Sequence, residues 1–276
     1  MGSDETIDVI VCAKNARGTL ALCLGALLKQ KGLGKIIVVH PYDDQLTPFI
    51  ARNFLKTVVV HEALTSCLAY ARKQGACFSS ASWVTYVDAD VILGKNHLWA
   101  LYQTAKALNV KPIAVEGILQ KKTLRKSILS SEQLYQTKCF VKGERGFTHN
   151  TLFNREILDS WLPPWTYAWE DYHLTQHVLK NGGVWVRTHT PYRGLNLQDY
   201  DLFHRGAWSS AGERVVKQLG YITMVQSIFI SFGAAIKSLV IRRNIRLFLE
   251  QIIIGLAKLS GYFAWTKYFV LQVQRE

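Results

Sequence analysis

Short runs of apolar and β-branched residues alternate along the first 110 residues with segments in which leucine and alanine recur at helical spacing. Four of these runs predict buried strands, at residues 8–12, 35–40, 57–61 and 83–87. The helical spacing predicts helices at residues 20–32, 47–54, 64–75 and 97–108. Because strands that alternate with helices form βαβ units, we expect an α/β fold with a parallel sheet covered on both faces.

The pattern is less regular after Pro112. Further strands are predicted at residues 113–117, 147–154 and 184–188. A basic amphipathic helix is predicted at residues 123–135, and a helix that begins with two acids at residues 169–181.

Two long apolar segments follow, at residues 221–241 and 247–271, with one and three charged residues respectively. Each is long enough to cross a hydrocarbon core, which takes ~20 residues. We therefore predict a first domain at residues 1–212 and membrane-associated helices at residues 213–276. A pair of buried helices in a soluble domain is the alternative. The turn between the segments carries Arg242, Arg243 and Arg246.

The first domain is expected on the cytoplasmic side of the membrane. Residues 1–7 are acidic and lack the apolar region of a signal peptide. The five cysteines form no CxxC pair, which favours small buried thiols in a reducing compartment over disulfides. A spanning hairpin would then place the basic turn outside, against the positive-inside rule. We therefore favour helices that lie in the interface or re-enter the membrane.

Composition and charge narrow the class of partner. With 49% hydrophobic and 19% charged residues, the chain is neither disordered nor collagen-like. The net charge of +13 suits nucleic acid, anionic lipid or a phosphorylated substrate. Residues 111–145 hold eight basic and three acidic side chains, residues 205–276 hold ten and three, and the remainder is nearly neutral. No nucleic-acid-binding motif is present, so we expect an anionic membrane surface and no nucleic acid.

Two acidic motifs are the candidate chemical groups. Asp88-Ala89-Asp90 follows directly on the fourth predicted strand, where ligands bind in open parallel sheets. Carboxylate oxygens at that edge suit a hard divalent cation that holds a diphosphate, although such acids also occur at ordinary turns. Glu170-Asp171 is surrounded by aromatic residues, which would desolvate a carboxylate and suit a general base. An acidic helix N-terminus without catalytic function is the alternative. The aromatic residues are Trp161, Trp165, Tyr167, Trp169 and Tyr172.

The order and spacing of these motifs resemble glycosyltransferase family 2, whose members have the GT-A fold, over residues 8–208. Residues 9–15 (VIVCAKN) resemble the family's first strand and nucleotide-binding turn, and residues 36–44 (IIVVHPYDD) its second strand with an acidic cluster. Residues 68–75 (LAYARKQG) resemble the helix that faces the donor. Residues 203–212 (FHRGAWSSAG) resemble a variant of the Q-x-x-R-W signature of cellulose-synthase-like members. The C-terminal segment is similar to those of membrane-associated members that use polyprenyl or dolichyl phosphate.

The resemblance implies a Rossmann-like, mostly parallel sheet flanked by helices, and it implies roles for particular residues. It implies Mn²⁺ or Mg²⁺ bound by Asp90 and Asp88, with His204 or His189 as a further ligand. Residues implied in donor binding are Ala13, Lys14, Asn15, Asp43, Asp44, Arg72, Asp88, Arg205 and Trp208.

The implied reaction is an inverting transfer of a hexose from a nucleotide sugar of the GDP-mannose or UDP-glucose type. Asp171, beside Glu170, would remove a proton from the acceptor hydroxyl. The implied acceptor is lipid-linked, such as dolichyl or polyprenyl phosphate or a lipid-linked glycan. If that acceptor is a phosphate it is already anionic, and Asp171 would orient it or support the metal site.

Seven basic residues lie between the metal motif and the base, in the region that forms the acceptor side in the family. They suit a phosphate-bearing lipid or the membrane surface, and a solvated basic face is the alternative. They are Lys121, Lys122, Arg125, Lys126, Lys138, Lys142 and Arg145.

Two other functions fit parts of the pattern. One is a soluble glycosyltransferase that acts on a protein or a free glycan. The other is a non-enzymatic protein that binds membranes or nucleic acid, which the charge suits but the neutral N-terminal half does not.

Overall fold

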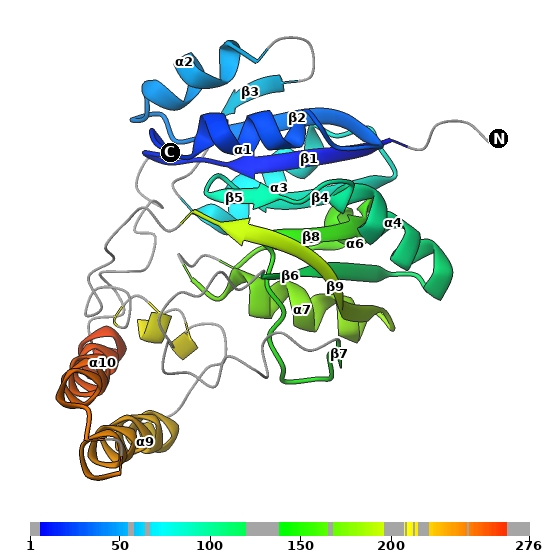
Figure 1. Cartoon of the computed structure of the whole chain (residues 1–276). Helices are drawn as coiled ribbons and strands as arrows, with labels where there is room; N and C mark the ends of the chain where they lie inside the picture. The colour runs from blue at the N-terminus through cyan, green and yellow to red at the C-terminus, as the bar shows by residue number, and fades with distance from the viewer. Residues whose placement is uncertain are drawn as a thin grey trace, which may run out of the picture. The chain divides into compact units, whose positions relative to one another are not determined.

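The computed structural model of the chain describes residues 6–54, 58–63, 67–119, 138–164, 168–195, 207, 209–211, 213–214, 221–241 and 243–263. Its strands form one sheet in the order β3-β2-β1-β4-β8-β6-β9-β5, with β7 paired to β9 (Figure 1). The helix predicted at residues 123–135 lies outside the described residues.

The first half of the sheet confirms the βαβ pattern. Its four strands are parallel to their neighbours, and they are β1 (Ile7–Cys12), β2 (Leu33–His40), β3 (Val58–Glu62) and β4 (Trp83–Asp88). Three helices connect them, α1 (Leu20–Leu27), α2 (Leu46–Arg52) and α3 (Leu68–Cys77). The first helix ends earlier than predicted, and Gly32, with a φ of 79°, lies in the turn that enters β2.

The second half of the sheet corrects the prediction of a mostly parallel arrangement. Its strands are β5 (Val91–Leu93), β6 (Ile113–Leu119), β7 (Lys138–Cys139), β8 (Asn150–Asn154) and β9 (Val184–Gly194). β8 runs antiparallel to both β4 and β6, β6 is parallel to β9, and β5 and β7 are antiparallel to β9. The sheet is therefore mixed. An apolar run predicts that a strand is buried on both faces but carries no information about its direction.

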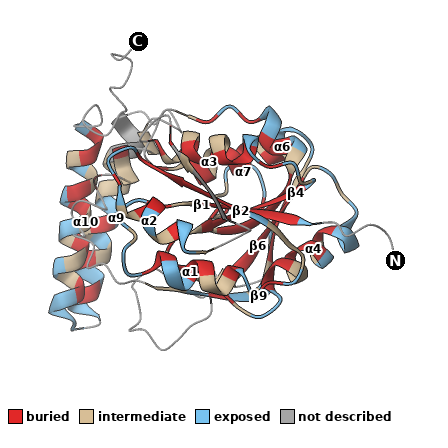
Figure 2. Cartoon of the chain, turned by 90° about the horizontal axis from the view of Figure 1, so that it is seen from above, coloured by how far each residue is buried: buried red, intermediate tan, exposed pale blue. Residues whose placement is uncertain are grey.

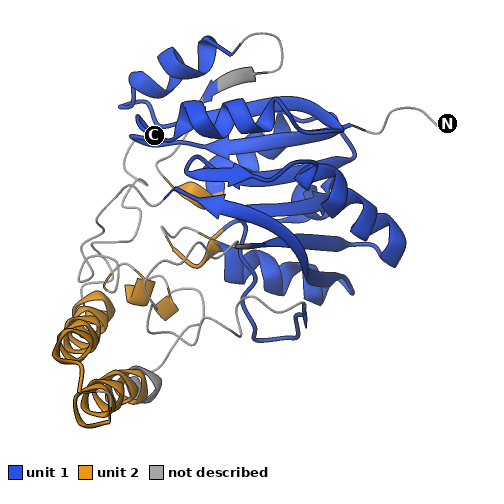
Figure 3. Cartoon of the chain, in the orientation of Figure 1, with its two compact units in different colours: residues 1–66, 70–163, 171–197 blue, residues 67–69, 164–170, 198–276 orange. Residues whose placement is uncertain are grey.

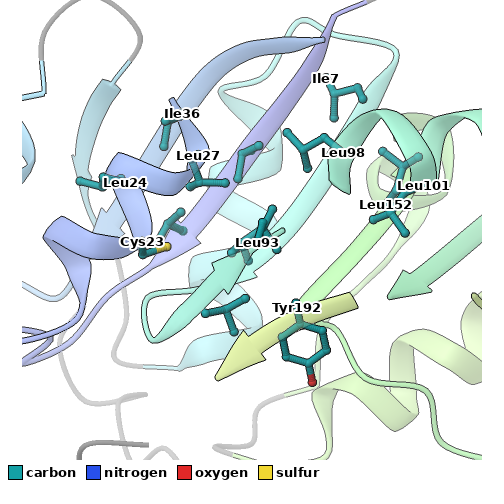
Figure 4. Close-up of a cluster of buried hydrophobic side chains, with 14 of the residues drawn as sticks. Ile7, Cys23, Leu24, Leu27, Ile36, Leu93, Leu98, Leu101, Leu152 and Tyr192 are labelled. Carbon is teal, nitrogen blue, oxygen red and sulfur yellow. The ribbon is translucent and has the colours of Figure 1, made fainter. Parts of the chain in front are cut away.

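Helices cover both faces of this sheet. α1 and α4 (His97–Leu108) lie on one face, and α3, α6 (Arg155–Ser160) and α7 (Glu170–Lys180) lie on the other (Figure 2). The main hydrophobic cluster fills the layer under α1 and α4, where Leu24, Leu27, Leu98 and Leu101 are fully buried (Figure 4). This packing fixes the carboxyl end of β4, which carries the first acidic motif.

The chain divides into two compact units, each described here by itself (Figure 3). Unit 1 holds residues 1–66, 70–163 and 171–197, and unit 2 holds residues 67–69, 164–170 and 198–276. Unit 2 contains α9 (Tyr221–Val240) and α10 (Ile245–Phe263), which match the two predicted apolar segments as far as residue 263. Within the described residues, neither of these helices nor any other is long and apolar enough to span a membrane.

The five cysteines, all among the described residues, form no disulfide there. Cys23 and Cys67 are buried, Cys12 is half-buried, and Cys77 and Cys139 are exposed. The prediction of burial is therefore wrong for the last two. Cys77 is the last residue of α3 and Cys139 lies in the two-residue strand β7, positions where an apolar sequence context does not ensure cover.

Candidate active site

The first acidic motif forms the turn between β4 and β5. Asp88 is the last residue of β4, and its backbone N–H donates to the His149 carbonyl over 3.1 Å. Arg72, a buried residue of α3, donates from Nη2 to Asp88 Oδ1 over 2.6 Å. The structure therefore brings the predicted residues Arg72 and Asp88 together, with a charge-assisted hydrogen bond between them.

Asp90 is the half-buried acid of this turn. Burial, and then the negative charge of Asp88, raise the pKa of its carboxyl, while its own backbone N–H and His149 act in the opposite direction. A bound cation would favour the ionised form of a carboxyl whose pKa a neighbouring negative charge raises. His149, which precedes β8, forms a hydrogen bond from Nε2 to the Tyr192 hydroxyl. No sequence pattern selects His149, because a lone histidine before a strand follows no metal-ligand spacing.

The predicted nucleotide-binding turn borders a cavity of about 460 Å³, which Asn15 lines. Ala13 is buried, and Lys14 and Asn15 are exposed beside it. Arg17 and Phe49 line the cavity but were not predicted, since neither belongs to a motif. The lining residues are Asn15, Arg17, Asp43, Asp44, Gln45, Leu46 and Phe49.

The two acids of this cavity have different environments. Asp44 is buried and fully engaged, because Oδ1 accepts from the backbone N–H groups of Leu46 and Thr47 and Oδ2 accepts from Asn15 N–H and the Thr47 hydroxyl. Although burial raises the pKa of Asp44, the hydrogen bonds from Thr47, Asn15 and Leu46 outweigh it and hold that pKa below its usual value. Asp43 is exposed. Asp44 therefore joins the two loops, and Asp43 is the acid that can reach a ligand.

The second acidic motif begins α7, where Glu170 and Asp171 are both buried. Arg145 Nε donates to Asp171 Oδ1 over 2.8 Å, and the same oxygen accepts from Tyr172 N–H at 2.8 Å. The environment predicted for Asp171 was aromatic, but its charged partner in the structure is an arginine. Of the predicted aromatic residues, Trp161 donates a hydrogen bond from Nε1 to His173 Nδ1. Trp165 and Tyr167 lie outside the described residues.

One short segment, residues 145–149, links the two acidic motifs. Its first residue pairs with Asp171, and the carbonyl of its last residue accepts from Asp88 N–H. Five residues span at most ~14 Å between their terminal Cα atoms, because an extended chain covers ~3.3–3.6 Å per residue. Both motifs therefore border the same small region of unit 1.

Buried contacts hold this segment in place. Glu116, on β6, accepts from Phe147 N–H at 3.0 Å, and Gly146 N–H donates to the hydroxyl of Thr175 on α7. Glu116 also pairs with Arg187 Nε at 2.8 Å and accepts from Trp185 Nε1 at 3.0 Å. The segment is thus fixed to both the sheet and α7.

Other predicted residues are not brought to the site by the described part of the chain. His204, Arg205 and Trp208 lie outside the described residues. His189 is exposed on β9. Among the described residues, no group of three or more His, Cys, Asp or Glu side chains is arranged to hold a metal ion, so Asp88 and Asp90 stand as a pair.

A mixed sheet between helices, with two acids at the end of β4 and a cavity beyond β1 and β2, defines a GT-A-like fold. Residues 8–162 match the model of glycosyl transferase family 2. The chain belongs to that family and is a glycosyltransferase of the GT-A type.

Solved structures with this fold include two bacterial glycosyltransferase-like chains. Residues 1–349 of TarS from S. aureus, also solved in complex with UDP, share 13% identity at a TM-score of 0.53, with 95% of this chain and 90% of that chain covered. Glucosyl-3-phosphoglycerate synthase from Mycobacterium tuberculosis, solved with Mn²⁺, UDP and phosphoglyceric acid, shares 16% identity at a TM-score of 0.57, with 78% of each chain covered. Similarity at this identity shows the fold alone. No curated protein sequence matches the chain.

Proposed function

We propose that the chain is a metal-dependent inverting hexosyltransferase that uses a nucleotide-sugar donor and a lipid-linked acceptor. The observation that carries the proposal is the position of Asp88 and Asp90 at the carboxyl end of β4, joined to Asp171 by residues 145–149. A donor diphosphate beside the first motif and an acceptor beside the second would then be neighbours.

The donor nucleotide would occupy the cavity lined by Asn15, Arg17, Asp43 and Phe49. The exposed Phe49 ring can stack on a nucleobase, and Asp43 can accept hydrogen bonds from a ribose or base. Arg72 would hold Asp88 in position through its ion pair. Both GDP-mannose and UDP-glucose fit this chemistry.

The carboxylates of Asp88 and Asp90 fit a divalent cation such as Mn²⁺ or Mg²⁺. The raised pKa of Asp90 supports this, since its causes, burial and the charge of Asp88, are both offset by a bound cation. When bound, the cation would neutralise the charge that develops on the leaving diphosphate. Oxygen ligands suit either metal.

Asp171 is the proposed general base for a hydroxyl acceptor. Its carboxylate would take the proton as the acceptor oxygen attacks the anomeric carbon from the face opposite the diphosphate. Arg145 and the Tyr172 N–H both bind Oδ1, which orients the carboxylate and leaves Oδ2 for the acceptor. For a phosphate acceptor, the same pair would orient an oxygen that is already anionic.

The proposed acceptor is a dolichyl or polyprenyl phosphate or a lipid-linked glycan. Lys142 is exposed, and Lys138 and Arg145 are partly exposed, on the strand and loop that approach Asp171. Lys138 pairs with Glu144 and Arg145 with Asp171, so the positive charge of Lys142 is the one that best suits a phosphate-bearing acceptor. The other four basic residues of the predicted acceptor segment lie outside the described residues.

The test is a donor panel, offered to the purified full chain with Mn²⁺ and dolichyl phosphate. We expect transfer from one nucleotide hexose, loss of transfer with a chelator, and recovery when the metal is restored. Asp171→Asn should lose transfer to a hydroxyl acceptor while donor binding, measured by calorimetry, is unchanged. Full activity in that variant would refute the role of Asp171, and transfer to a free glycan or protein alone would refute the lipid acceptor.

A further inference from the structure

The hairpin of α9 and α10 has large apolar side chains on its outside. The two helices pack side by side (Figure 1). Along α10 the exposed positions repeat at helical spacing and contain only isoleucine, leucine and phenylalanine beyond the first turn. α9 adds a second group of exposed apolar side chains, which Gln226, Gly233 and Lys237 interrupt. The residues are Phe229, Ile230, Ile236, Leu239 and Val240 on α9, and Ile245, Leu249, Ile253, Leu256, Leu259 and Phe263 on α10.

The interface between the two helices shows the opposite composition. Lys258 of α10 donates from Nζ to the hydroxyls of Ser227 and Ser231 on α9, over 3.2 and 3.0 Å. Burial lowers the pKa of Lys258, with the charge of Glu213 acting in the opposite direction. Gly255 packs against the side chains of Phe232 and Ser231. Most buried residues of the hairpin are small or polar, and Leu247 and Tyr262 are the large ones among them, whereas most of the exposed residues are bulky and apolar.

This inverted pattern indicates apolar surroundings. In water, an amphipathic helix pair buries its large apolar residues and exposes its polar ones. Helices that pack in lipid instead meet through small residues and interhelical hydrogen bonds, and direct their apolar side chains outward. An exposed stripe this extensive marks a surface that is covered in the working protein.

The charge at the turn between the helices indicates what covers the exposed apolar stripe. Lys237, Arg243 and Arg246 are exposed there. In the described part of the hairpin the acidic residue is Glu250, and it pairs with Arg246 at 3.0 Å. An apolar face with positive charge at one end matches the acyl boundary and headgroups of an anionic bilayer.

We propose that the α9–α10 hairpin docks on anionic lipid, with its outer apolar stripe in the acyl boundary and its basic turn among the headgroups. In this proposal both helices lie along the membrane surface. This docking needs neither donor nor acceptor, so it stands or falls separately from the proposed reaction.

Vesicle flotation of the full chain tests the docking. Vesicles of phosphatidylcholine alone are compared with vesicles that contain phosphatidylglycerol. We expect the chain to float with the anionic vesicles, and floated protein to fall as salt is raised, because surface charge is screened.

Paired variants identify the surface. Leu249→Gln with Leu256→Gln should lower vesicle partition at least tenfold, while the control Leu22→Gln with Leu108→Gln, also at exposed leucines, should leave it unchanged. Lys237→Gln with Arg243→Gln should lower partition by about fivefold for each charge removed. Its control is Lys29→Gln with Lys95→Gln, at exposed positions in unit 1. Circular dichroism and thermal unfolding confirm that each variant is folded.

Three results would overturn the proposal. One is a full chain that remains unbound to both kinds of vesicle. Another is a dimer in solution that the Leu249→Gln, Leu256→Gln variant converts to monomer without change in vesicle binding, which would make the cover a second copy. The third is equal loss of binding in the control variants.

Discussion

Removing the guanidinium of Arg187 should strongly destabilise unit 1. Arg187 and Glu116 are almost fully buried, with side-chain exposures of 3% and 2%, and their atoms are 2.8 Å apart. In Arg187→Met, Glu116 keeps the neutral donors Trp185 Nε1 and Phe147 N–H. Its negative charge would then lack its cation in a region that water does not reach.

The expected loss in the free energy of unfolding follows from the burial of this ion pair. Removing one partner of a buried ion pair costs about 3–5 kcal/mol, a large share of the roughly 5–15 kcal/mol by which domains are stable. The double variant Glu116→Gln, Arg187→Met removes both charges and retains the side-chain volume, so it should recover about 1–2 kcal/mol of that loss. The control is Arg155→Met at an exposed pair with Asp159, at 3.4 Å, which should cost less than about 1 kcal/mol.

Urea unfolding followed by tryptophan fluorescence measures these free energies, with Trp185 in the affected region as a reporter. We also expect Arg187→Met to lose transferase activity at urea concentrations below its unfolding midpoint. The reason is that Glu116 holds Phe147, which lies in the segment that contacts both acidic motifs. A loss below about 1 kcal/mol in Arg187→Met, or a double variant no more stable than the single, would refute the account of a buried charge that needs its partner.

Three further predictions concern stability and donor binding. Burial lowers the pKa of His97 to about 4, so the folded state excludes a proton that the unfolded chain binds below about pH 6.5. The free energy of unfolding should therefore fall by up to ~3 kcal/mol between pH 6.5 and 4, and His97→Gln should flatten that part of a pH series. Gly146→Ala should lower the melting temperature, because the added Cβ would clash with the Trp185 ring. Gly25→Ala should raise it, because the added Cβ would meet open space on α1. Asp44→Ala should weaken nucleotide binding in calorimetry by detaching Asn15 from α2, more than Asp43→Asn weakens it; equal effects would contradict a positioning role.

Local patterns were sufficient to predict much of the fold. The apolar runs of β1 to β4 and the helices between them follow from local spacing, and Asp88 lies at the end of β4 as expected. Strand direction in the second half did not follow, because β8 and β6 are apolar runs of the same kind as the parallel strands. Their direction depends on connections of irregular length.

Contacts distant in sequence account for what was missed at the candidate site. Arg145 and Asp171 are 26 residues apart, and the sequence pattern assigns Arg145 only to a general basic segment. No local pattern joins a loop arginine to a helix N-terminus. Asp44 did carry a local signal, since an aspartate just before a helix commonly accepts hydrogen bonds from the first backbone N–H groups of that helix, and that use competes with nucleoside contact.

Residues 145–149 have a practical consequence for redesign. A protein engineer who exchanges this loop to change the acceptor also exchanges the carbonyl that holds the Asp88 backbone and the arginine that holds Asp171. A successful graft must therefore carry compatible versions of Glu116 and Thr175, which hold the loop from β6 and from α7. Under the proposed function, a change of this loop would alter acceptor choice and donor affinity together.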